Sequence, residues 1–103
     1  MKVYISGAIS GTEGYKDKFH KAENYFKERG FDVVNPCKIT DEMPFDYAER
    51  MELCLCMIKH VDGIALFPDW ENSKGARLEK NYAETLGKAV WFLPHSLVER
   101  MKP

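Results

Sequence analysis

Four short apolar segments alternate with three segments of helical periodicity, and this order constrains the fold most strongly. The apolar segments are predicted strands at 2–6, 31–34, 62–67 and 89–93, and the predicted helices span 15–29, about 47–59, and 73–88. Such alternation with short connections is typical of a parallel sheet with helices on both faces. We therefore expect an α/β fold, formed by residues 1–103 as a single domain with a modest core.

Residues that typically begin or end helices support these boundaries. Gly30 and Gly87 stand where the first and third helices should stop, and Asp46 and Ser73 stand where the second and third should start. The segments 37–44 and 68–72 are predicted loops. Residues 96–101 are predicted to add one or two helical turns.

Composition excludes several classes of function. The net charge of -1 does not indicate a protein that binds nucleic acid. The longest apolar runs, such as 63–68, are too short to cross a bilayer. The first residues resemble no signal peptide. Three cysteines, an odd number, favour a reducing environment, so we expect a cytoplasmic protein. No second ligand pair at zinc spacing exists, and we expect neither a metal nor an organic cofactor.

Glu79 interrupts the apolar side of the third predicted helix. At about 100° per residue, its neighbours within roughly 60° are Gly75, Ala76, Tyr82, Ala83 and Leu86. An ionised carboxylate is costly to bury unless it is paired or functional. Three readings remain open: a structural carboxylate bonded to the first loop or to a lysine, a general base, or a nucleophile toward a sugar carbon.

Two glycine-containing loops should leave the carboxyl ends of neighbouring parallel strands. They are the segments 7–11 and 68–75. Backbone N–H groups of such loops can approach an anion, and together the two could enclose one phosphate from two sides. The alternative is a tight turn in one case and a capped helix in the other.

Two further side chains fall near this predicted edge. Trp70 could stack on a nucleobase, contact a partner chain, or fold back over the third helix. His95 is the histidine that follows the last strand, at the ligand end of the sheet.

Three stretches of the chain resemble the nucleoside 2-deoxyribosyltransferase superfamily. They are 6–11, 61–79 and the Tyr82-Ala83 pair with Leu86-Gly87-Lys88. Within it the chain is most similar to a small domain family of unknown function, frequent in phages and bacteria, and to the 2′-deoxynucleoside 5′-monophosphate N-glycosidases. The resemblance implies a flavodoxin-like three-layer αβα sandwich with four to five parallel strands. It also implies a homodimer or higher homo-oligomer.

The resemblance also implies residue roles. Glu79 matches the nucleophile that attacks the anomeric carbon, and Tyr4 or Tyr82 could orient its carboxylate. The phosphate would be lined by Gly7, Ser10, Gly11, Ser73 and Gly75, and the base or sugar pocket by Ala8, Ile9, Cys54, Asp69 and Trp70. Two positions depart from the pattern: Ser10 replaces an Arg of the glycosidases, and Cys54 replaces an Asp of the family.

The expected function is therefore cleavage or transfer at the N-glycosidic bond of a (deoxy)nucleoside 5′-monophosphate. Because a thiol replaces a carboxylate only with a lowered pKa, Cys54 favours a second class, a non-catalytic module that binds or sequesters a nucleotide. A third possibility is a small interaction domain that uses Trp70, Phe45 and the tail. The sequence indicates no nucleic-acid or membrane partner.

Overall fold

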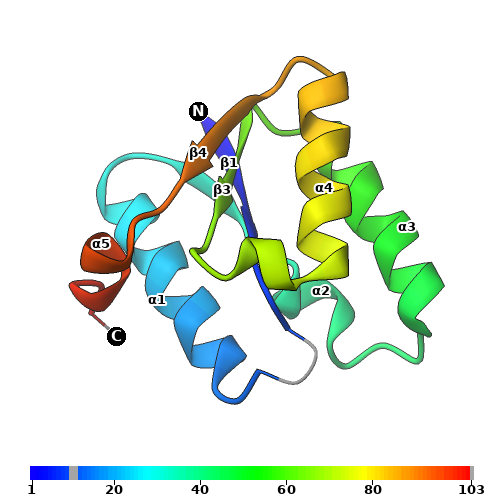
Figure 1. The fold of residues 1–103 in the computed structure, drawn as a ribbon, viewed down its shortest axis with the longest axis horizontal. Helices are drawn as coiled ribbons and strands as arrows, with labels where there is room; N and C mark the ends of the chain where they lie inside the picture. The colour runs from blue at the N-terminus through cyan, green and yellow to red at the C-terminus, as the bar shows by residue number, and fades with distance from the viewer. Residues whose placement is uncertain (10–11, 103) are drawn as a thin grey trace.

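Four parallel strands form the centre of the computed structural model, which describes residues 1–9 and 12–102 (Figure 1). They are β1 (Lys2–Ser6), β2 (Asp32–Val34), β3 (Gly63–Leu66) and β4 (Ala89–Phe92), in the sheet order β2-β1-β3-β4. The chain moves from β1 to one side of the sheet and then crosses to the other side. The crevice at the carboxyl ends of β1 and β3 is therefore the switch point at which α/β sheets bind ligands.

Helices cover both faces of the sheet. They are α1 (Tyr15–Glu28), α2 (Cys37–Thr40), α3 (Tyr47–Ile58), α4 (Lys74–Thr85) and α5 (His95–Glu99), with a 3₁₀ turn, η1, at Trp70–Asn72. In Figure 1, α1 and α5 lie on one side of the sheet and α3 and α4 on the other. The predicted flavodoxin-like three-layer fold is confirmed. Within the described ranges, no helix is long and apolar enough to span a bilayer.

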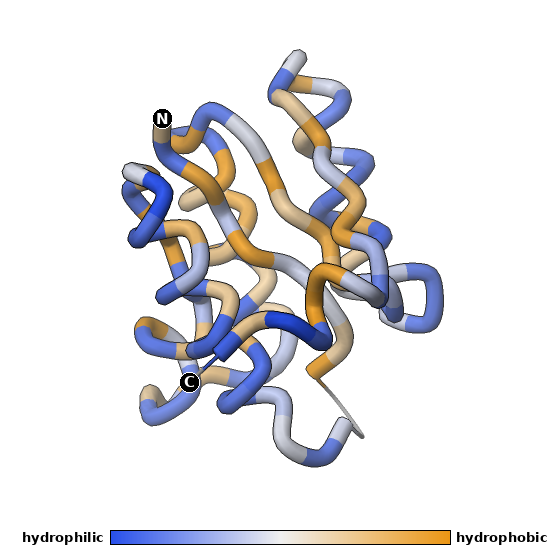
Figure 2. The backbone as a smooth tube through the Cα atoms, turned by 90° about the vertical axis from the view of Figure 1, so that its left-hand side faces the viewer, coloured by the Kyte–Doolittle hydropathy of each residue, from blue (hydrophilic) through white to orange (hydrophobic). Residues whose placement is uncertain are grey.

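Alternate side chains of the strands feed two separate cores. Val3 and Ile5 of β1 pack toward α1, where Phe19 and Phe67 are fully buried and their rings meet edge to face. Tyr4 lies in the other core, which faces α3 and α4. Figure 2 shows the hydrophobic character concentrated in the strands between the helical layers. This period of two decides that Tyr4 and Ser6 share the face on which α4 packs.

The predicted helix boundaries hold where a cap residue marks them. Gly30 and Gly87 have positive φ angles of 86° and 73°. Asp46 forms a capping box with Glu49, and the Ser73 hydroxyl accepts from the Ala76 amide. These four caps confirm the predicted starts and stops.

The prediction of unbroken loops over 37–44 and 68–72 is wrong. The first segment contains α2, which Pro36 starts with a φ of -63°, and the Thr40 hydroxyl donates to the Pro36 carbonyl. The second contains η1. Each of these helical pieces is too short to show a hydrophobic period in the sequence.

A buried carboxylate joins α1 to the segment that leads into α2. Glu23 is 3% exposed, and its oxygens accept hydrogen bonds from Lys27 and Lys38 at 2.6 and 2.8 Å and from the Asn35 amide at 3.1 Å. Burial alone would raise the pKa of Glu23, but these three donors outweigh burial and lower it to about 2. The cluster therefore fixes the position of α2 relative to α1.

Candidate active site

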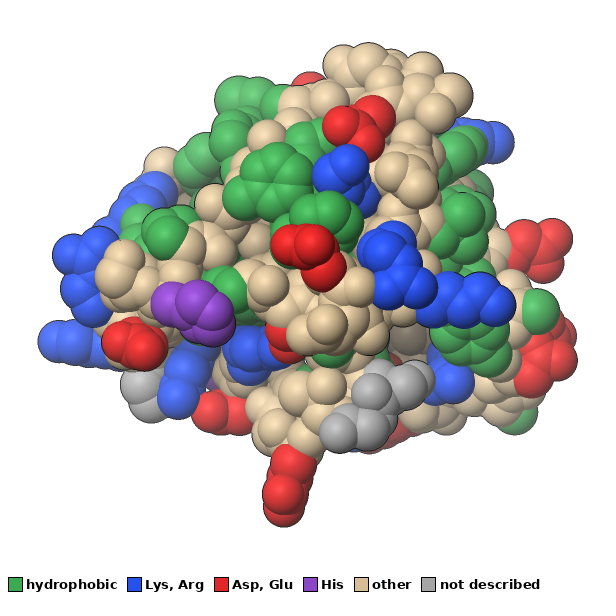
Figure 3. Space-filling model, in the orientation of Figure 1, with side chains coloured by type: hydrophobic (Ala, Val, Ile, Leu, Met, Phe, Trp, Pro, Cys, Tyr) green, Lys and Arg blue, Asp and Glu red, His purple; other side chains and the backbone are tan. Residues whose placement is uncertain are grey.

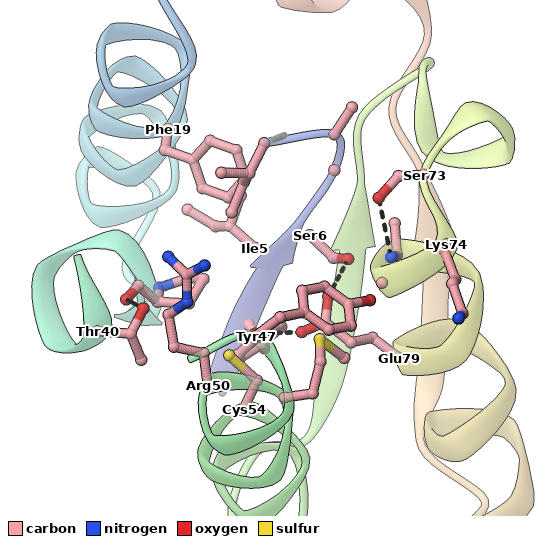
Figure 4. Close-up of a pocket in the computed structure, with 18 of the residues that line it drawn as sticks. Ile5, Ser6, Phe19, Thr40, Tyr47, Arg50, Cys54, Ser73, Lys74 and Glu79 are labelled. Carbon is pink, nitrogen blue, oxygen red and sulfur yellow. Dashed lines mark hydrogen bonds between the residues drawn. The ribbon is translucent and has the colours of Figure 1, made fainter. Parts of the chain in front are cut away.

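A cavity of about 390 Å³ lies at the carboxyl ends of β1 and β3. Its walls come from β1, the loop after β1, α2, α3 and the first two turns of α4. Figure 4 shows Ser73 and Lys74 on one side, Arg50 and Thr40 on the other, and Glu79 between them. This is the position that the sheet topology favours for a ligand.

Glu79 is held in the wall of this cavity by two hydroxyl groups of β1. Tyr4 Oη donates to Oε2 at 2.5 Å, and Ser6 Oγ donates to Oε1 at 2.7 Å. The residue is 6% exposed and belongs to the lining of the cavity. Both oxygens are thus fixed in orientation, while the carboxylate keeps an edge toward the open space.

Burial dominates the electrostatics of this group. It raises the pKa of Glu79 above the ordinary glutamate value, although hydrogen bonds from Ser6, Tyr4 and Cys54 act in the opposite direction. Burial also raises the pKa of Tyr4, and the nearby Glu79 charge raises it further. Tyr4 therefore remains a protonated donor to the Glu79 carboxyl group.

Cys54 lies beside this pair on α3 and lines the same cavity. Burial, followed by the Glu79 charge, raises the pKa of its thiol to about 11. A thiol with this pKa stays neutral at neutral pH, so Cys54 adds no negative charge to the cavity. It can still donate a hydrogen bond to Glu79.

One face of α3 forms the wall opposite α4. Tyr47, Arg50, Met51 and Cys54 all line the cavity, at spacings of three and four residues. Helical geometry places such positions on one side. This face carries a phenol, a guanidinium and two sulfur atoms, whereas Ile58, further along, is fully buried in the core.

The start of α4 offers donors to an anion. Lys74 and Gly75 line the cavity with Ser73, whose hydroxyl caps the helix through the Ala76 amide. Neither the Lys74 nor the Gly75 amide has an acceptor among the described residues. These free amides and the helix dipole favour a negative group at this end.

The loop after β1 is held by Asp69 rather than left open. The Ala8 amide donates to Asp69 Oδ1 at 3.1 Å, and Lys18 Nζ lies 2.7 Å from Oδ2. A Cβ at Gly7 would come within 2.6 Å of the Phe67 ring, so packing alone requires that glycine. Gly7, Ala8 and Ile9 all line the cavity. Ser10 and Gly11, predicted phosphate ligands, lie outside the described residues.

Asp69 and three other predicted or considered side chains lie away from the cavity. Asp69 is not in its lining; Tyr82 packs into the core beneath α3 and α4 and gives Glu79 no hydrogen bond. The Trp70 ring centroid is 5.5 Å from the Phe92 ring centroid, and Lys80 Nζ lies 5.2 Å from the Trp70 centroid. Trp70 therefore folds back over α4, the third of its predicted alternatives. His95 is exposed at the start of α5.

The structure adds residues that the sequence reasoning missed. Ser6 opens the stretch 6–11, but the sequence analysis predicts no role for it. Its spacing of two from Tyr4 indicates that both side chains lie on the same face of the sheet. Arg50 stands four residues before Cys54, a helical spacing that was equally visible. Asp41 also lines the cavity, but it follows α2, which no pattern predicted. Among the residues placed in the structure, no group of His, Cys, Asp and Glu is arranged to hold a metal ion.

Comparison with known proteins agrees with this architecture. A family model described as a domain of unknown function (DUF4406) matches residues 1–92. Among curated proteins, none matches the chain.

Two of the solved structures that match this chain illustrate the shared fold. One is a CMP N-glycosidase, BcmB, of Clostridium botulinum, with 21% identity and a TM-score of 0.64. The other is a 2-deoxyribosyltransferase of Leishmania mexicana, with 20% identity and a TM-score of 0.71. Each match covers 89% of this chain. The chain spans 67% of the length of the first protein and 63% of the length of the second, and the second share is less than two thirds. The predicted likeness in fold to the deoxyribosyltransferase superfamily is confirmed.

Proposed function

We propose that this chain, which belongs to the DUF4406 family, cleaves or transfers the N-glycosidic bond of a nucleoside 5′-monophosphate. Glu79 is the nucleophile. The proposal is supported by the fold that the chain shares with an N-glycosidase and a deoxyribosyltransferase. It depends on one observation above all: a carboxylate that is 6% exposed is aimed into a cavity large enough for a small ligand.

The arrangement around Glu79 suits attack on a sugar carbon. In the first step, a carboxylate oxygen forms a bond to C1′ while the C1′–N bond breaks, and its electron pair leaves with the base. The departing base takes a proton from water. Tyr4 and Ser6 hold the carboxylate so that it loses little orientational freedom on reaction. In the second step, water or another base attacks C1′ and releases Glu79.

The phosphate lies at the start of α4 in this proposal. The phosphate would accept hydrogen bonds from the free amides of Lys74 and Gly75 and from the Lys74 ammonium group, next to Ser73. Gly75 has a packing reason as well, because a Cβ there would lie 3.3 Å from Met51 Sδ and 3.4 Å from Tyr47 Oη. The glycine thus leaves the cavity open between α4 and α3.

Release of free base tests the proposal. The protein is incubated with each nucleoside and deoxynucleoside 5′-monophosphate, and the base is quantified by chromatography. Glu79→Gln and the exposed α3 variant Glu52→Gln serve as the test and its matched control. We expect base from the wild type and from Glu52→Gln, and only background from Glu79→Gln. Equal background in all three would reject catalysis for those substrates.

Cys54 supports a second candidate, a nucleotide-binding module without turnover. Its thiol, with a pKa raised to about 11, cannot carry the charge of a catalytic carboxylate. Titration calorimetry distinguishes the two functions. Tight nucleotide binding without base release supports the module, and the same binding with base release supports the enzyme.

A homodimer is proposed from exposed apolar side chains on α3 and on the segment just before it. Phe45, Tyr47 and Leu53 are 38%, 45% and 38% exposed, and Tyr47 also lines the cavity. Figure 3 shows hydrophobic side chains at the surface over α3 and α4. A second copy seated here would cover the mouth and exclude water from the reaction.

Light scattering on the purified protein checks this dimer. We expect twice the chain mass for the wild type and a monomer for Phe45→Glu combined with Leu53→Glu. Leu86→Glu is the control, since Leu86 is similarly exposed but lies at the opposite end of α4. A monomeric wild type, or dissociation by Leu86→Glu alone, contradicts the proposed interface.

A further inference from the structure

A carboxylate at the end of α2 faces the cavity with one oxygen unpaired. The Asp41 side chain is 7% exposed. Its Oδ2 accepts from Tyr15 Oη at 3.0 Å and lies 3.7 Å from Lys16 Nζ, while no described residue donates to Oδ1. Every fully buried side-chain oxygen or nitrogen in the described part of the chain has a partner. Oδ1 is therefore not fully buried, and because Asp41 belongs to the lining of the cavity, a ligand there lies next to this side chain.

Arg50 brings the opposite charge to the same end of the cavity. It lies on α3 between Tyr47 and Cys54 and is partly buried. Its guanidinium makes no hydrogen bond or ion pair with any residue that the structure describes, Asp41 included. A five-donor fork and a free acceptor thus line one cavity without satisfying each other.

This pair selects the chemistry of its ligand. A second anionic group would be attracted by Arg50 but repelled by Asp41. A cation would be attracted by Asp41 but repelled by Arg50. A neutral group with donors and acceptors along one edge satisfies both. In Figure 4, Arg50 lies across the cavity from Ser73 and Lys74, with Glu79 between them, which is the order of base, sugar carbon and phosphate in a nucleotide.

We infer that Asp41 and Arg50 read the edge of the nucleobase and select a base that carries an exocyclic amino group beside a ring acceptor. This inference rests on the proposed function and names the substrate class of the same site. Asp41 Oδ1 would accept from the amino group, and Arg50 would donate to the ring nitrogen or carbonyl next to it.

Cytosine and uracil show why the amino group decides. They differ at one ring position, where cytosine has an amino donor and uracil a carbonyl acceptor. A carboxylate oxygen attracts the former and repels the latter. The remaining donor of uracil, N3–H, is flanked by two carbonyl oxygens, so a carboxylate that approaches it meets both.

Calorimetry with three probes tests the inference. The probes are dCMP, dUMP and ribose 5-phosphate, and all measurements use a Glu79→Gln background so that no base is released. We expect dCMP to bind about tenfold or more tightly than dUMP, the effect of one hydrogen bond to a charged group. Adding Asp41→Asn should bring this ratio close to one. Ribose 5-phosphate has no base, so its affinity should be the same with either residue at position 41.

Matched variants separate this result from misfolding. Glu42→Gln removes an exposed carboxylate at the next position and should keep the preference for dCMP. Arg50→Gln should weaken both nucleotides and leave ribose 5-phosphate binding intact. Equal affinity for dCMP and dUMP in the presence of Asp41 overturns the inference, and so does a preference that survives Asp41→Asn. If ribose 5-phosphate still binds in these cases, the proposed function stands; if no probe binds, both are rejected.

Discussion

Replacing Glu79 by glutamine is expected to lower kcat/KM for base release by at least about a thousandfold, or about 4 kcal/mol of transition-state stabilisation. The amide keeps the shape of the side chain and can still bond to Tyr4 and Ser6. It cannot form the ester with C1′. Steady-state kinetics measure the loss, and a variant within tenfold of the wild type would exclude Glu79 as nucleophile.

The same substitution should raise stability, which separates a catalytic role from a purely structural one. Burial raises the pKa of Glu79, so the folded state disfavours the ionised form, and wild-type stability falls as pH rises above the ordinary glutamate value. Glutamine removes this cost, so the free energy of unfolding at neutral pH should rise. Denaturant titration checks the sign: a large loss of stability would mean that the carboxylate mainly supports the fold.

The pH profile of the wild type should carry the same signature. Only the ionised Glu79 attacks C1′, so kcat/KM should fall as pH drops through the raised pKa of this group. The acid limb is therefore expected above the range of an ordinary glutamate. A profile that stays flat down to that range would contradict the assignment.

Glu23→Gln is expected to destabilise the fold by about 3 kcal/mol at neutral pH, the equivalent of lowering a carboxyl pKa from 4.5 to about 2. The two lysine partners are half exposed, but the Glu23 side chain is 4% exposed, so solvent screens its charge only weakly. Removing one partner of a buried ion cluster leaves the others unpaired. Thermal melting should show a fall of roughly 10–20 °C.

Acid titration gives this prediction a direction. The pKa of Glu23 is depressed in the folded state, so its contribution is complete above about pH 4.5 and disappears as pH falls through about 2. The difference in free energy of unfolding between the wild type and Glu23→Gln should therefore become smaller as pH falls over this interval. Glu28→Gln, an exposed change at the end of the same helix, should alter stability by less than about 0.5 kcal/mol. A pH-independent gap would contradict the ion-cluster explanation.

Local signals in the sequence were sufficient for the fold. Apolar strands, helix caps at Asp46 and Ser73, and glycines at 30 and 87 placed the four strands and the three long helices nearly to their ends, whereas α2 and η1 were missed. Glu79 stood out because a carboxylate broke an apolar period, and the structure places it in a cavity wall as the periodicity required. Its role as nucleophile stays a prediction.

Long-range contacts explain what the sequence could not show. Asp69 looked like a pocket residue but ties the loop after β1 through Ala8 and Lys18, two contacts made across more than fifty residues. Trp70 found a partner in Phe92, which belongs to a later strand. Asp41 entered the cavity through α2, a turn too short to leave a periodic trace. Proximity created by tertiary packing has no local pattern.

The way α3 is divided has a consequence for the evolution of this domain. Its first two turns present side chains to the cavity, whereas Ile58 near its end belongs to the packed interior. Exchange of Tyr47 or Arg50 should therefore retune which molecule is accepted while the sheet and its covering layers stay intact. Ligand choice and foldability are separable along a single helix.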